Sequence, residues 1–167
     1  YALEDGVRLR ALEPETVAAP VDSGPRHLVL DDDGGAVYVL TEFTAQVLRY
    51  ERDAATGTLS LAGTAATADP AAGLGPSRFG LDPRANHVIW SADLQWGAPA
   101  ADGARFLWAS GRSASTLAAV AVAADGAYLV AAGERSTTVS LYAVDGDRLE
   151  LLQQAETGAG ANWVRFV

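Results

Sequence analysis

A hairpin signal repeats along this chain at a fixed spacing. Asp33-Gly34 separates the runs 28–31 and 36–40, and Asp125-Gly126 separates a similar pair of runs 92 residues later. An Asp-Gly pair tolerates the positive φ that a tight hairpin turn requires, so each pair of runs predicts two antiparallel strands. A chain that repeats such a unit in register folds as an array of similar units.

A second predicted hairpin follows each of these two. Its turns begin at Asp53 and Asp145, again 92 residues apart, and Asp5 marks a third copy 48 residues before Asp53. The period is therefore about 46 to 48 residues, close to the length of a four-stranded propeller blade. A β-sandwich also has short strands and frequent turns, but it has no reason to repeat a four-stranded unit in register. The pattern predicts an all-β protein, a β-propeller with four-stranded antiparallel blades.

This period divides the chain into five segments. They are the outer half of one blade (1–20), a complete blade (25–64), an irregular blade (75–113), a second complete blade (116–154) and one further strand that would close a ring (161–167). The total is about three and a half blades, whereas a closed propeller needs about four to eight. The missing blades come either from the remainder of a longer protein or from a second copy of the chain.

The irregular blade admits two alignments with the others. One places Asp93 opposite Glu42 of the preceding blade. The other makes 92–96 an innermost strand and 105–110 its partner, with an Asp-Gly turn between them. We prefer the second alignment, in which the few residues between Arg112 and the next blade leave no room for an outer hairpin of roughly 20 residues.

Composition excludes several classes of function. The 167 residues include 12 basic and 21 acidic side chains, and the net charge of −9 repels a nucleic-acid backbone. No apolar run approaches the roughly 18 to 20 residues of a membrane helix, so we expect a soluble protein with no membrane partner, and we place it in the cytoplasm. The absence of cysteine excludes disulfides, and two histidines are too few for an ordinary zinc site.

Several short motifs resemble one family. They are Gly24-Pro25-Arg26-His27 with the following Glu42, the run Trp108-Ala109-Ser110-Gly111-Arg112, and the turn Asp53-Ala54-Ala55-Thr56-Gly57. Together they resemble the lactonase family of seven-bladed propellers, which includes 6-phosphogluconolactonases and the fungal carboxy-cis,cis-muconate cyclases. The resemblance runs from Tyr1 to Val167 and corresponds to the C-terminal half of the family's propeller. Ser91-Ala92-Asp93-Leu94 and the run ending at Arg112 look closer to the cyclase branch.

Hairpin geometry brings the distinctive polar residues of these motifs together. Arg26 begins the first strand of one hairpin and Glu42 ends the second, so both lie at the same end of the blade. Arg112 ends the corresponding strand of the next blade and converges on the same axial face. A pair of arginines binds a carboxylate or phosphate through charge-assisted, bidentate hydrogen bonds. His27, one residue after Arg26, is expected on the opposite face of its strand, where it supports the site.

The resemblance implies an enzyme that needs no cofactor and acts on a small anionic lactone or muconate. The implied catalytic residues are Glu42, Arg26 and Arg112, with Glu42 transferring a proton, and the implied substrate-binding residues are Arg26, Arg112 and His27. Two departures stand against it: the N-terminal blades are absent, with a histidine that the cyclase branch is thought to use, and so is one outer hairpin. The competing hypothesis is a noncatalytic propeller that binds a protein or a ligand, in which Arg26 and Glu42 form only a salt bridge.

The remaining candidates have structural interpretations. Asp93 is either a further polar residue on the axis or an acid next to a turn, and we favour the second. Asp31-Asp32-Asp33 lacks the ligand spacing of a calcium loop and is expected to be a solvated turn. His87 is expected in a solvated loop. Wide aromatic rings suit packing between blades, which is the role expected for the four tryptophans, with the lining of a pocket as the alternative for one of them: Trp90, Trp96, Trp108 and Trp163.

Overall fold

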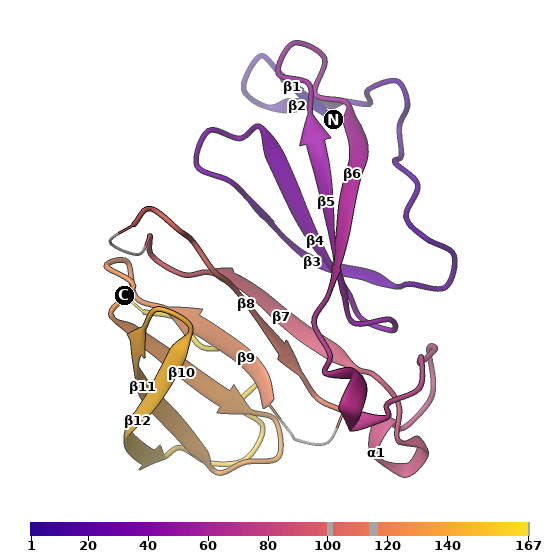
Figure 1. Cartoon of the computed structure of the whole chain (residues 1–167). Helices are drawn as coiled ribbons and strands as arrows, with labels where there is room; N and C mark the ends of the chain where they lie inside the picture. The colour runs from indigo at the N-terminus through magenta and orange to yellow at the C-terminus, as the bar shows by residue number, and fades with distance from the viewer. Residues whose placement is uncertain (100–101, 114–116, 167) are drawn as a thin grey trace.

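The computed structural model describes residues 1–99, 102–113 and 117–166 (Figure 1). The described strands form antiparallel sheets, two of them four-stranded, and the prediction of an all-β fold with four-stranded blades is confirmed. Among the described residues the two helices are short, a 3₁₀ turn over Pro70–Ala72 and α1 over Pro83–Asn86. No helix of the described residues is long and apolar enough to span a membrane.

The first four-stranded sheet has the order β3-β4-β5-β6. Its strands are β3 (Pro25–Leu30), β4 (Ala36–Thr41), β5 (Gln46–Arg52) and β6 (Leu59–Ala66). The β3–β4 turn closes where Gly34 adopts a φ of 67° and the Asp31 carboxylate accepts a hydrogen bond from the Ala36 amide at 2.9 Å. Gly34 supplies the positive φ expected of the Asp-Gly pair, and Asp31 lies two residues before that pair, so chemistry local to the turn sets this register.

The second four-stranded sheet repeats this order as β9-β10-β11-β12. Its strands are β9 (Leu117–Val122), β10 (Tyr128–Gly133), β11 (Thr138–Asp145) and β12 (Arg148–Glu156). Gly126 again has a positive φ, 69°, in the turn between its first two strands. The same turn chemistry therefore begins both complete blades.

Two smaller sheets complete the described fold. β1 (Ala2–Glu4) pairs with β2 (Arg8–Arg10), and β7 (Ser91–Trp96) pairs with β8 (Leu107–Gly111). The β7–β8 pair is the one that the preferred alignment of the irregular blade places there. The predicted absence of an outer hairpin after Arg112 falls on residues 114–116, which lie outside the described residues.

The first strands of three successive blades contact one another in turn, β3 with β7 and β7 with β9. Residues of β3 bond to residues of β7 that lie 66 positions later in the chain. The three bonded pairs are Arg26 with Ala92, His27 with Asp93, and Leu30 with Trp96. A constant offset means that the two strands run in the same direction. The axial edge of the blades is thus one continuous surface to which each inner strand contributes.

Each of these inner strands also shifts its register near its beginning. The shifts fall between Pro25 and Leu28, between Ser91 and Leu94, and opposite Ala132/Gly133 in β9. In each case one additional residue is accommodated on the inner strand, as a β-bulge does. A bulge turns a side chain away from strict alternation, which matters for the residues of the axial edge described below.

Apolar side chains hold neighbouring blades together. Leu40 and Val47 of one blade pack with Leu94 of the next, and Val37, Leu48 and Tyr50 form a second buried cluster. Full burial of a side chain such as Leu40 or Leu94 contributes roughly 1.5–3 kcal/mol relative to exposure. These contacts fix β7 against β4 and so fix the polar residues that β7 carries.

Trp96 provides a further contact between blades, in line with the packing role predicted for it. Its ring meets Tyr38 edge-on with centroids 5.0 Å apart, and its indole N–H donates to the Leu30 carbonyl at 2.6 Å. The Arg105 guanidinium lies 4.4 Å from the centroid of the same ring and forms an ion pair with Asp32 at 2.7 Å. Asp32, expected in a solvated turn, therefore links two blades while remaining largely exposed.

The expectation of a closing strand over 161–167 differs from the structure. Residues 161–166 lie outside the strands, and Val167 lies outside the described residues. Trp163 and Val164 instead line a cavity beside Ala119 and Val120 of β9. An extended segment becomes a strand only when a neighbouring strand pairs with its backbone, and proximity to β9 is not accompanied by such pairing here.

Candidate functional site

Glu42 occupies a fixed position between two blades. It follows β4 directly, and its amide donates to the Gly24 carbonyl at 2.7 Å. Its own carbonyl accepts from the Ser91 amide at 2.9 Å, which ties it to the start of β7. The Glu42 backbone is therefore held from both sides before its side chain makes any contact.

The Glu42 carboxylate binds two arginines from two blades. Its Oε1 lies 2.7 Å from Nη2 of Arg112 and 3.4 Å from Nε of Arg26. Arg112 follows β8, and its amide donates to the Trp90 carbonyl at 2.7 Å while its guanidinium lies 5.8 Å from the centroid of the Trp90 ring. The structure thus brings together the three residues that hairpin geometry predicted to converge.

Burial lowers the pKa of Arg112, and the positive charge of Arg26 lowers it further, while Glu42 and Glu134 act in the opposite direction. Two guanidiniums that share one carboxylate oxygen are only partly neutralised by it. The Arg112 Nε is buried and has no hydrogen-bond partner among the described residues. Such a pair favours an additional anion nearby.

His27 faces the same site as Arg26, so the prediction that it lies on the opposite face is wrong. Its Nε2 lies 3.1 Å from Nη1 of Arg26, and its Nδ1 lies 2.7 Å from Oδ1 of Asp93. The physical reason is the register shift between Pro25 and Leu28, which breaks the alternation of side chains where these two residues lie. The bulge gives the site a histidine that ideal strand geometry would have turned away.

Asp93 is a buried residue of β7 and not an acid next to a turn, which corrects the favoured interpretation. Its carboxylate accepts from His27, from the Leu94 amide at 2.9 Å and from the Val120 amide at 3.1 Å, and so contacts β3, β7 and β9. Its amide donates to the Ser110 hydroxyl at 3.1 Å. The signal that pointed to it was the alternative alignment that set Asp93 opposite Glu42.

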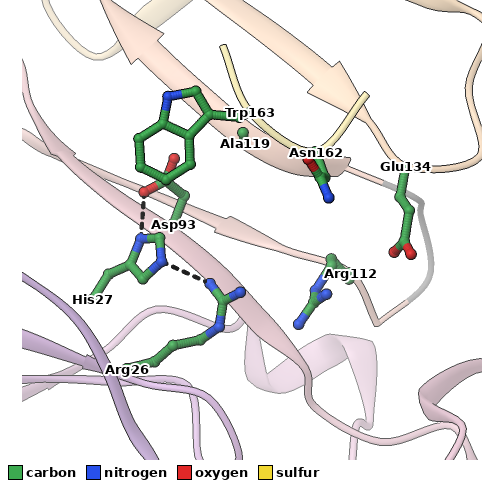
Figure 2. A pocket seen from close by; sticks show the side chains of 8 residues that line it. All are labelled: Arg26, His27, Asp93, Arg112, Ala119, Glu134, Asn162 and Trp163. Carbon is green, nitrogen blue, oxygen red and sulfur yellow. Dashed lines mark hydrogen bonds and ion pairs between the residues drawn. The ribbon is translucent and has the colours of Figure 1, made fainter. Parts of the chain in front are cut away.

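A cavity of about 280 Å³ opens at these residues (Figure 2). Figure 2 shows His27, Asp93 and Trp163 on one side of the cavity and Arg112, Asn162 and Glu134 on the other, with Arg26 between them. Glu134 and Asn162 were not predicted, because Glu134 follows β10 and Asn162 lies in a segment without regular structure. Trp163 is the tryptophan that lines the cavity, which was the alternative to packing. Glu42 is not one of the described residues that line the cavity.

The chemistry available here is that of charged and hydrogen-bonding side chains. Two arginines offer donors to an anion, a histidine bonded to a carboxylate offers proton transfer, and the largely exposed indole of Trp163 offers a flat apolar face. The described residues contain no group of three or more histidines and carboxylates placed to hold a metal ion. The geometry therefore suits a small, polar, negatively charged ligand.

Comparison with known families gives a match along nearly the whole chain. Residues 1–159 match the family described as Lactonase, 7-bladed beta-propeller. The matched range includes Arg26, Glu42 and Arg112 and ends shortly before Asn162 and Trp163.

Two curated relatives carry one name. The chain is 27% identical over 190 residues to the 6-phosphogluconolactonase of Sodalis glossinidius, covering 98% of this chain and 52% of that protein. It is 29% identical over 182 residues to the 6-phosphogluconolactonase of Pectobacterium carotovorum, covering 93% and 48%. The chain thus spans about half the length of the curated relatives it matches. Both alignments are longer than the chain, so each relative carries residues without a counterpart here.

Solved structures show the same fold. The periplasmic gluconolactonase of Pseudomonas aeruginosa matches with a TM-score of 0.67 at 21% identity, covering 93% of this chain and 46% of that one. A putative 6-phosphogluconolactonase of Bacteroides uniformis matches with a TM-score of 0.58 at 21% identity, covering 86% and 44%. At these identities the likeness establishes the propeller fold alone.

Proposed function

The chain belongs to the lactonase family of seven-bladed β-propellers, and on this basis we propose that the protein hydrolyses the lactone ring of a small anionic substrate. Two curated relatives named 6-phosphogluconolactonase support lactone hydrolysis as the reaction. Neither of these two relatives is named a muconate cyclase, so lactone formation from a carboxymuconate is a subordinate part of the proposal and an outcome of its test.

One observation carries the proposal: two guanidiniums from successive blades line one cavity while sharing one carboxylate. Arg26 and Arg112 both face the cavity of about 280 Å³, and Glu42 holds them from outside its lining. An anion that enters the cavity meets two sets of planar donors already restrained by their salt bridges. Hydrogen bonds to charged groups contribute about 1.5–3 kcal/mol each, enough to select a phosphorylated or carboxylated lactone over a neutral one.

We propose a phosphorylated sugar lactone as the substrate, with 6-phosphogluconolactone as its first representative. The phosphate binds Arg26 or Arg112, and the sugar ring lies against the exposed face of Trp163. Neutral gluconolactone offers the same ring without the phosphate. It is therefore the matched comparison for the phosphorylated lactone.

Hydrolysis requires water to add to the lactone carbonyl, an oxyanion to form, and the ring C–O bond to break. The guanidinium that does not hold the phosphate is positioned to stabilise that oxyanion. Glu42 fixes both guanidiniums through its Oε1, which is its first proposed task. Proton transfer by Glu42, which the family resemblance implies, is its second, and kinetics separate the two tasks.

The experiment compares three substrates and one substitution in the purified protein: 6-phosphogluconolactone, gluconolactone and a carboxymuconolactone, with Glu42→Gln. We expect a kcat/KM for the phosphorylated lactone at least about tenfold above that for gluconolactone. If Glu42 only fixes the arginines, Glu42→Gln mainly raises KM; if it transfers a proton, kcat falls and KM stays near its original value. Glu51→Gln, in an exposed ion pair with Arg49, is the control.

Three results would redirect the proposal. Conversion of the carboxymuconolactone alone, with the carboxymuconate as the product, would establish the cyclase reaction. Unchanged turnover in Glu42→Gln would remove Glu42 from the mechanism. Binding of the phosphorylated ligand without hydrolysis of any of the three lactones would establish the competing hypothesis, a noncatalytic propeller that binds ligands.

A further inference from the structure

His27 and Asp93 form a hydrogen-bonded pair on the wall of the cavity. Their Nδ1 and Oδ1 atoms lie 2.7 Å apart, and both residues line the cavity that contains Arg26 and Arg112. The His27 side chain is about one-third exposed, whereas that of Asp93 is almost completely buried. The histidine therefore reaches the cavity while its partner stays behind it.

Backbone hydrogen bonds hold the Asp93 carboxylate in one orientation. It accepts hydrogen bonds from the Leu94 amide at 2.9 Å and from the Val120 amide at 3.1 Å. Both donors are backbone groups of inner strands, so the carboxylate cannot turn without disrupting β7 or β9. Its Oδ1 consequently has one fixed direction toward His27.

These bonds assign the proton on the imidazole ring. Asp93 accepts from two backbone amides, so His27 Nδ1 donates to it and Nε2 carries the lone pair. That lone pair accepts from Nη1 of Arg26 at 3.1 Å. The nitrogen that would accept a proton in catalysis is thus covered by an arginine that also faces the cavity.

We infer that His27 is the general base of lactone hydrolysis, with Asp93 as the residue that positions it and Arg26 as a cover that anionic substrate removes; this rests on the proposed function. A bond from Arg26 to phosphate is charge-assisted at both ends, whereas its bond to a neutral imidazole is not. The phosphate therefore competes with His27 Nε2 and with the Ala92 carbonyl for Nη1 of Arg26, while Nε of Arg26 stays paired with Glu42. Substrates without an anionic group leave the base covered.

Over one turnover His27 takes up one proton and releases it again, so the site gains and loses none. As the water oxygen bonds to the lactone carbonyl carbon, His27 Nε2 takes one water proton and the carbonyl oxygen becomes an oxyanion. The oxyanion then re-forms the carbonyl, the ring C–O bond breaks, and His27 returns the proton to the departing ring oxygen. The product is the open hydroxy acid, and the imidazole is neutral again.

The test uses the two histidines of the chain as a matched pair. His27→Gln is expected to lower kcat for 6-phosphogluconolactone by about 100-fold or more with KM changed less than about threefold, as loss of a general base does. His87→Gln removes an exposed imidazole whose Nε2 lies 3.2 Å from the Ala72 carbonyl, outside the cavity lining, and it should leave kcat unchanged. Added imidazole should restore His27→Ala at least about tenfold, which a purely structural defect would not allow, and Asp93→Asn should lower kcat without such rescue.

Nuclear magnetic resonance of the ¹⁵N-labelled imidazoles tests the cover without turnover. We expect His27 to carry its proton on Nδ1, and the Nε2 signal of His27 but not that of His87 to move when inorganic phosphate is added. Either of two results would contradict the claim that Arg26 covers Nε2 until an anion binds: a proton on Nε2 of the free protein, or an Nε2 signal that phosphate does not move. If kcat of His27→Gln stays within about threefold of the unsubstituted value, His27 is not the general base and the proposed function stands. If the unsubstituted protein hydrolyses no lactone, the proposed function and the role of His27 both fail.

Discussion

Arg112 and Glu42 lie 70 positions apart in the chain, yet Nη2 of the arginine lies 2.7 Å from Oε1 of the glutamate. Arg112 follows β8 of the irregular blade, and Glu42 follows β4 of the complete blade before it. The same carboxylate oxygen also meets Arg26 at 3.4 Å, so one acid joins the polar edges of two blades.

Arg112→Lys should weaken anion binding. Lysine keeps the charge but loses the planar, forked donors that bind phosphate bidentately. We expect KM for 6-phosphogluconolactone to rise by about 10- to 100-fold and that for gluconolactone to rise much less, as steady-state kinetics would measure. Arg49→Lys, which changes an exposed ion pair on β5, is the control, and equal losses for both lactones would contradict an anion-binding role.

Gly24→Ala should destabilise the protein more than Gly34→Ala. Both glycines have positive φ, 66° and 67°, but a Cβ at Gly24 would lie 2.6 Å from Cδ2 of Phe43, whereas nothing lies within 4 Å at Gly34. Backbone strain costs about 1 kcal/mol at either position, and the clash should add about 1–2 kcal/mol at Gly24. Urea unfolding measures both. Because the Gly24 carbonyl holds the Glu42 amide, lactone hydrolysis should also fall in Gly24→Ala, and equal stability of the two variants would contradict the clash.

Trp96→Phe should loosen the contact between two blades. The substitution removes the indole donor that bonds to the Leu30 carbonyl at 2.6 Å and shrinks the ring on which Arg105 stacks. We expect a loss of about 1–3 kcal/mol in the free energy of unfolding. Trp163→Phe, on a ring that is 77% exposed, should cost less than about 0.5 kcal/mol in the same urea titration. Similar losses for the two variants would show that Trp96 does not join the blades.

Asp53 should contribute stability that acid removes. The Thr56 amide and then the Thr56 hydroxyl hold the pKa of the Asp53 carboxyl below its ordinary value of 3.8. A carboxyl whose pKa is lower in the folded state stabilises the protein above about pH 4, and the contribution disappears as pH falls through the folded-state pKa. Asp53→Asn should therefore lower the thermal midpoint at pH 6 and flatten its decline toward pH 2. Asp147→Asn, in the exposed turn after β11, should follow the unsubstituted profile, and a parallel profile for Asp53→Asn would contradict the prediction.

Sedimentation separates the two proposed sources of the missing blades. The described strands form two four-stranded and two two-stranded sheets, fewer than a ring of seven blades contains. If a longer polypeptide supplies the rest, the 167-residue chain should sediment as a monomer of 17.3 kDa, which is the result we expect. A species of twice that mass, stable on dilution, would favour a ring built from two copies.

Local rules were sufficient for the hairpins and for part of the site. The Asp33-Gly34 and Asp125-Gly126 turns lie where the sequence predicts them, since a tight turn depends on adjacent residues that alone determine its φ angles. The convergence of Arg26, Glu42 and Arg112 was also predicted, because each lies at the end of a hairpin strand on the same side of its blade. The roles of these three residues in a reaction remain predictions.

The sequence by itself determined the repeat, the all-β class and the turns, because each depends on residues that are neighbours in the chain. The tertiary structure decided the direction of His27 and the burial of Asp93. A one-residue register shift in each inner strand overrides side-chain alternation, and the partners of His27 and Asp93 come from the neighbouring inner strands. Alternation of residues predicts a regular strand, but only the packed blades show where the strand departs from it.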